Sequence, residues 1–93
     1  MKFYNLDADR LSAMLKALAH PVRLEIVQIL SDSGEANCVD LTKHAGLAQS
    51  TVSEHLRVLK EAGLIKQCGP GPRSGYCIQR DALIWLKQAM VAL

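Results

Sequence analysis

The chain has 93 residues and a formal net charge of +2 at pH 7, and 49% of its residues are hydrophobic. This length suits a single domain over residues 1–93, and so small a domain buries only a modest share of its surface alone. The slight basic excess does not by itself indicate a nucleic acid. No apolar run approaches the roughly 18 residues of a membrane span, and the amino terminus lacks the apolar stretch of a secretory signal. We therefore expect a cytoplasmic protein with no membrane partner.

Two amphipathic helices are predicted in the first third of the chain. In residues 7–19, leucine and methionine recur at helical spacing. The His20–Pro21 step ends this helix, because a residue before proline avoids the helical region, and proline then suits the first turn of a second helix over about 21–31. The segment SDSGEAN at 31–37 is predicted to be a turn. A short strand before the third helix is only faintly indicated.

Residues 38–62 have the pattern of a helix-turn-helix. A short helix is predicted at about 38–45, and Gly46 ends it in the manner of a C-cap glycine. A longer helix follows at about 49–62 and is closed by Gly63. Two helices joined by a tight, glycine-containing turn are typical of DNA-binding proteins, in which the second helix enters the major groove.

After this unit the pattern changes from a helical to a strand-like repeat. The runs LIKQC and GYCIQ have the composition of short strands, and the proline- and glycine-rich GPGPRS between them predicts the loop of a β-hairpin. The final segment, 81–93, is helical again, with leucine and methionine at three- and four-residue spacing. This order predicts a mainly α fold with a β-hairpin wing, which is a winged helix-turn-helix.

A polar stripe on the predicted helix at 49–62 is the candidate DNA-binding surface, opposite its apolar face. Hydroxyl and amide groups near the start of such a helix can reach phosphates or base edges, and Arg57 can bind a phosphate or a guanine. Glu54 on the same stripe repels phosphate; it either accepts a hydrogen bond from cytosine N4 or pairs with Arg57. Lys60 is expected to contact the DNA backbone, and Arg73 on the hairpin loop is expected to bind phosphate or to enter an adjacent minor groove. The candidate residues for binding double-stranded DNA are Gln49, Ser50, Thr51, Ser53, Arg57, Lys60 and Arg73.

Apolar stripes on the first and last helices predict a homodimer. Neither stripe can be fully buried within so small a domain, so a second copy of the chain is expected to cover them. The candidate interface residues are Leu11, Leu15, Leu18, Leu83, Leu86 and Met90. An alternative is a winged-helix module that only binds other proteins, which the near-neutral charge permits. No nucleophile–base pair, phosphate loop or metal cluster is visible, so neither an enzyme nor a cofactor is predicted.

Three cysteines, Cys38, Cys68 and Cys77, are the candidates for chemistry at sulfur. An odd number gives no closed framework of disulfides, and free thiols suit a reducing cytoplasm. Cys68 and Cys77 lie on the two predicted strands of the hairpin, in a register that the sequence leaves open. They are either inert small side chains or a thiol switch, in which oxidation joins them and alters the wing.

Two segments, LKALAHPVRLEIVQIL and VDLTKHAGLAQSTVSEHLRVLKEAGLI, resemble the ArsR/SmtB family of bacterial transcriptional repressors. The resemblance covers roughly residues 10–90. It implies winged-helix homodimers whose first and last helices form the interface, and which bind palindromic operators. It also implies DNA contacts along the polar stripe and at Arg73. In this family an inducer, often a metal or metalloid, releases the DNA; the sequence does not identify the inducer of this chain.

The chain departs from the two familiar metal sites of that family. Arsenic-type members carry Cys-Val-Cys-Asp-Leu at the start of the third helix, where this chain has Asn37, Cys38 and Val39, with its thiol at the non-ligand place. Zinc-type members carry ligands on the last helix, where DALIWLKQAMVAL has no histidine. We therefore expect no metal site. Ala48 also stands where serine often caps the recognition helix, which should cost about 1 kcal/mol of helix stability.

Overall fold

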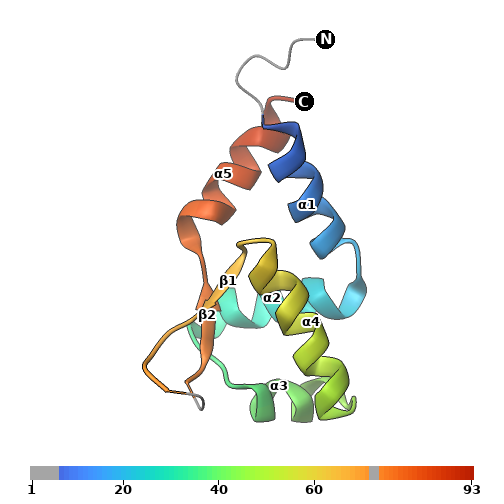
Figure 1. The fold of residues 1–93 in the computed structure, drawn as a ribbon, viewed down its shortest axis with the longest axis vertical. Helices are drawn as coiled ribbons and strands as arrows, with labels where there is room; N and C mark the ends of the chain where they lie inside the picture. The colour runs from blue at the N-terminus through green and yellow to red at the C-terminus, as the bar shows by residue number, and fades with distance from the viewer. Residues whose placement is uncertain (1–6, 72–73) are drawn as a thin grey trace.

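The computed structural model describes residues 7–71 and 74–93 of the chain. Within these ranges the elements are α1 (Ala8–Leu18), α2 (Pro21–Ser33), α3 (Cys38–Ala45), α4 (Gln49–Glu61), β1 (Ile65–Gln67), β2 (Tyr76–Ile78) and α5 (Arg80–Val91). This order confirms the mainly α fold with a β-hairpin wing. In Figure 1, α1 and α5 lie together at one end of the molecule, and α3 with the start of α4 lies at the other.

The first two helices begin where local capping signals predict. The Asp7 carboxylate and the His20 ring nitrogen each accept a hydrogen bond from a backbone N–H in the first turn that follows. The predicted end of α2 was wrong: the helix continues through Ser33, whose hydroxyl donates to the carbonyl of Ile29 at 2.8 Å. Polar residues on its solvent side do not end a helix, and the chain leaves the helical path only at Gly34, where φ is 86°.

The helix-turn-helix has the predicted bounds to within one residue. The Asn37 side chain caps α3 by accepting from the Asp40 N–H at 2.8 Å, and Gly46 ends it in the left-handed region, with φ of 66°. At α4, Ala48 precedes the first turn without a side-chain cap, as its methyl group requires. α3 and α4 pack directly on each other.

The wing is an antiparallel hairpin in which Ile65 faces Ile78, Lys66 faces Cys77 and Gln67 faces Tyr76. The two isoleucines are buried and anchor one face of the hairpin in the core. Because successive side chains of a strand alternate, the Lys66–Cys77 pair lies on the outer face. The faintly indicated strand before α3 reduces to a single bridge between Ala36 and Tyr76.

One hydrophobic core joins all five helices to the base of the hairpin. Its largest fully buried side chains are Met14, Leu30, Leu41, Leu56, Leu59, Leu64, Ile65 and Val52. In the part of the chain that the structure describes, no helix is both long enough and apolar enough to cross a membrane.

Two of the predicted interface residues belong to this core instead of an open surface. Leu11 is 5% exposed and Leu86 is 3% exposed in the single chain, because α1 and α5 pack against each other. The premise that one chain cannot bury these stripes was therefore wrong for Leu11 and Leu86. Leu18 and Leu83 are partly buried against the core. Leu15 and Met90 keep 36% and 48% of their surface exposed.

Candidate nucleic-acid interface

The candidate interface is the outer face of α4. Val52, Leu56 and Leu59 turn inward and are fully buried, which holds the helix at a fixed rotation against the core. The opposite face is open to solvent, as the helical wheel predicts. The exposed residues on and beside that face include Gln49, Ser50, Thr51, Ser53, Glu54, Arg57 and Lys60.

The amino-terminal turn of α4 combines small polar side chains with unused backbone donors. Gln49, Ser50 and Thr51 are exposed, and no acidic residue lies in this turn. The N–H groups of Thr51 and Val52 both donate to the Ala48 carbonyl at 3.1 Å, whereas those of Gln49 and Ser50 find no acceptor within residues 7–71 and 74–93. Such a helix start, with free N–H groups and the positive end of the helix dipole, can bind a phosphate oxygen.

Ser53 has a neighbour that the sequence did not reveal. Its hydroxyl oxygen lies 3.4 Å from the Cys38 sulfur on α3, and the Thr42 hydroxyl lies 3.9 Å from the same sulfur. The hydroxyl of Ser53 is therefore shared between the outer face of α4 and the contact with α3. This contact depends on how the two helices cross, so helical spacing alone could not indicate it.

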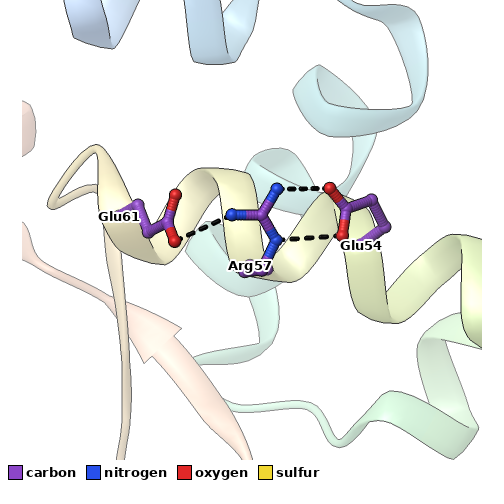
Figure 2. A network of polar contacts seen from close by, with 3 residues as sticks. All are labelled: Glu54, Arg57 and Glu61. Atoms are coloured by element: carbon purple, nitrogen blue, oxygen red, sulfur yellow. Dashed lines mark hydrogen bonds and ion pairs between the residues drawn. The ribbon is translucent and has the colours of Figure 1, made fainter.

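Arg57 sits between two carboxylates on the helix surface, as Figure 2 shows. Its guanidinium donates to both oxygens of Glu54, through Nε at 2.9 Å and through a second nitrogen, and to Glu61 at 2.8 Å. The hydrogen bond from Arg57 lowers the pKa of Glu54, and the same two carboxylates raise the pKa of Arg57. All three side chains are more than half exposed, so these ion pairs contribute little stability and are easily exchanged.

Lys60 lies toward the wing. The Lys60 ammonium donates to the Gln67 side-chain oxygen at 3.3 Å, which ties α4 to β1. Arg73 lies outside the described residues. Cys68 and Cys77 are joined by a disulfide across the hairpin, with their Cα atoms 6.0 Å apart.

The histidines have structural neighbours. His44 lies 2.8 Å from the Glu25 carboxylate and links α3 to α2. The rings of His20 and His55 lie 4.4 Å apart, centroid to centroid. Burial lowers the pKa of His55, and the nearby charge of His20 adds to this effect. Among residues 7–71 and 74–93, no three histidine, cysteine or acidic side chains are grouped to hold a metal ion.

A helix-turn-helix with an exposed second helix, followed by an antiparallel hairpin and a further helix, defines the class of the protein. It is a winged helix-turn-helix, the architecture of DNA-binding transcriptional regulators. More specifically, the chain belongs to the arsR family of bacterial regulatory proteins, whose family model matches residues 20–67, from the cap of α2 to the end of β1.

Curated relatives and solved structures agree with this assignment. The chain is 37% identical over 77 residues to the HTH-type transcriptional regulator YgaV of Escherichia coli, covering 83% of this chain and 78% of that protein. It is 35% identical over 83 residues to the arsenical resistance operon repressor of Staphylococcus xylosus, covering 89% and 79%. It also resembles the homodimeric winged helix-turn-helix DNA-binding domain Mb0332 from Mycobacterium bovis, solved by NMR in solution, with a TM-score of 0.73, 28% identity and coverage of 89% and 77%.

Proposed function

We propose that the chain is a cytoplasmic repressor that binds a palindromic operator in double-stranded DNA as a homodimer. The observation that carries this proposal is the amino-terminal turn of α4, which is exposed, free of acidic residues and supplied with unused N–H donors. Each copy places α4 in a major groove, and the two grooves lie about one helical turn apart. A relative named as a repressor and a structural neighbour described as a homodimeric DNA-binding domain support this assignment.

The charges on α4 indicate which half of the helix lies deeper in the groove. From its middle onward the helix carries Glu54 and Glu61, which balance Arg57 and Lys60, so this stretch has no net positive charge to attract phosphate. Its amino-terminal turn is neutral and presents Ser50 and Thr51 at the positive end of the helix. The helix therefore docks by this turn, and Arg57 reaches the DNA only after exchanging a carboxylate for a phosphate or a base.

The end of the molecule away from the amino-terminal turn of α4 is suited to a second copy of the chain. A groove of about 480 Å³ runs along α1, lined by small side chains at Ala8, Ser12 and Ala19, by Leu15, and by Leu93 from the chain end. Small residues at helical spacing allow another helix to approach closely. Met90 on α5 adds exposed apolar surface. A two-fold dimer through this end covers the apolar surface and leaves both α4 helices free to face DNA.

Fluorescence anisotropy with the DNA upstream of the chain's own gene tests the proposal. Ser50→Ala and Arg57→Ala should each weaken operator binding, by about 1–3 kcal/mol where the lost contact is to a base. Because Glu54 both repels DNA and holds Arg57, Glu54→Gln should strengthen binding. Asp9→Asn, which removes the same charge at the first turn of α1, is the matched control and should change affinity little.

The salt dependence separates two roles of Arg57. If it binds phosphate, Arg57→Ala lowers affinity equally on operator and on unrelated DNA and flattens the salt slope. If it reads a base, the loss is confined to the operator. Wild-type affinity in both Ser50→Ala and Arg57→Ala would show that α4 is not the recognition helix. Absence of any DNA binding would leave the winged helix as a protein-interaction module.

A further inference from the structure

The register of the wing hairpin places two cysteines, Cys68 and Cys77, close to each other. The Cys68 N–H donates to the Gly75 carbonyl at 2.9 Å, and Cys77 faces Lys66, so the two cysteines are diagonal neighbours across the strands. Both stand on the outer face with Lys66, opposite the buried Ile65–Ile78 pair. Their Cα separation of 6.0 Å lies inside the range of protein disulfides, and the two sulfurs are bonded.

One of the two cysteines is reachable from a cavity with a positive lining. A cavity of about 430 Å³ lies between the hairpin and the start of α5, and Cys77 forms part of its wall. Lys66 and Arg80 bring two positive charges to the same wall, against the one negative charge of Asp81. Cations beside a cysteine favour the reactive thiolate, and they also attract anionic reagents.

We propose that Cys68 and Cys77 form a reversible dithiol–disulfide site that reacts with anionic low-molecular-weight disulfides, and that its state sets the operator affinity. The proposal rests on the proposed function, because its effect is exerted through the DNA-binding wing. In the reduced state a thiolate of the pair attacks the reagent RS–SR and expels one RS⁻. The second cysteine then attacks the mixed disulfide and expels the other. The protein pair is oxidised, the reagent is reduced to two RSH, and the two thiol protons end on these products.

The position of the pair explains how the bond alters the regulator. It joins Cys68, which directly follows β1, to Cys77 within β2. β2 continues through Gln79 directly into α5, and its Tyr76 is hydrogen-bonded to Ala36 ahead of α3. A bond between Cys68 and Cys77 therefore fixes the end of β1 against β2, and β2 is joined to both the recognition unit and the helix assigned to the dimer. Without the bond the two strands are free to shift against each other as the wing meets the DNA backbone, so we expect the oxidised form to bind operator more weakly.

The chemical step is tested on the DNA-free protein. Fully reduced protein is exposed to glutathione disulfide, which is anionic, and to hydroxyethyl disulfide, which is neutral, and free thiols and intact mass are followed over time. We expect the wild type to lose two thiols as an intramolecular disulfide, and dithiothreitol to restore them. Cys68→Ser and Cys77→Ser should stop at a mixed disulfide, whereas Cys38→Ser should still form the bond.

Charge-matched variants test the cavity. Lys66→Gln should slow the reaction with glutathione disulfide several-fold and leave that with hydroxyethyl disulfide nearly unchanged. Lys87→Gln, at an exposed lysine of α5 outside the cavity, should change neither rate. Equal slowing with both reagents, or none with either, would refute the role of the cavity.

Operator binding of the two redox states tests the regulation. We expect the oxidised wild type to bind at least several-fold more weakly than the reduced protein, and Cys68→Ser to bind equally well before and after treatment. If the pair stays reduced in glutathione disulfide, or if both states bind alike, the proposal is wrong. Neither result would contradict the proposed function. The proposed function fails only if the reduced protein does not bind operator at all.

Discussion

Replacing Leu15 and Met90 together by alanine tests whether the open end of α1 and α5 is where two copies meet. These residues were predicted from the sequence to lie in the dimer interface, and they keep 36% and 48% of their surface exposed in the single chain. Their exposed parts add up to somewhat less than one whole side chain. In a two-fold dimer every contact occurs twice, so each substitution removes its contribution from both copies.

The size of the effect follows from the area that dimerisation would cover. Fully burying one large aliphatic side chain contributes about 1.5–3 kcal/mol, so the double variant loses about 3–5 kcal/mol over the two copies. At 1.4 kcal/mol for each factor of ten, the dissociation constant of the dimer should rise roughly a hundred- to several-thousand-fold. The fold should persist, because neither residue belongs to the buried core or to the hydrophobic side chains packed directly against it.

Sedimentation velocity over a range of protein concentrations measures this change directly. Wild type should sediment as a dimer at micromolar concentration, and the double variant as a monomer with an unchanged far-ultraviolet circular dichroism spectrum. Leu24→Ala is the control, because Leu24 is also an exposed leucine, at 53%, but belongs to α2 and does not line the groove along α1. A double variant that dimerises as tightly as wild type would refute the assignment of this face, and a monomeric wild type would refute the dimer itself.

Three further outcomes follow from local features. Ala48→Ser supplies the missing cap of α4 and should stabilise the protein by about 1 kcal/mol, seen as a rise in thermal midpoint; an unchanged midpoint would contradict this. The pKa of His55 is lowered by burial and by His20, so the unfolded chain takes up a proton first as the pH falls below the ordinary value of 6.5. The free energy of unfolding should therefore decrease as the pH falls from 6.5 to the pKa of His55 in the folded protein. In denaturant titrations across this range, His55→Gln should lose less stability than the wild type. Reducing the bond between Cys68 and Cys77 should destabilise the protein by about 2.5–3 kcal/mol, because the unfolded chain gains the entropy of the opened loop. A reducing agent should not change the stability of Cys68→Ser, which cannot form the bond.

The elements that could be predicted from the sequence are those with local signals. Asn37 and Gly46 bound α3 at both ends, and each acts through its own side chain or backbone angle. The predicted end of α2 is wrong because the polar residues at 31–33 have the composition of a turn, whereas the decisive feature is the positive φ of Gly34. The Arg57–Glu61 pair has the four-residue spacing of helical ion pairs, so it could have been predicted along with Glu54.

Other features depend on how distant segments meet and have no local signal. An apolar stripe indicates that one face of a helix is covered, but it does not say which segment or which chain covers that face. Leu11 and Leu86 are buried within one chain because α1 packs on α5. Likewise, the pairing of Cys68 with Cys77 depends on the hairpin register, since a one-residue slip would move one of them to the opposite face. The contact of Ser53 with Cys38 depends on the crossing of α3 and α4.

The weak charge of the protein bears on how it selects an operator. A formal net charge of +2, with two carboxylates on α4, gives little general attraction to the phosphate backbone. Under the proposed function, affinity then comes from a few well-placed contacts at the start of α4, used twice in a dimer. Joining two such helices in one dimer makes the second contact intramolecular, which multiplies a modest affinity per half-site. Loss of the dimer through Leu15 and Met90 should therefore weaken operator binding more than removal of any single α4 side chain, although neither residue lies on the DNA-binding face.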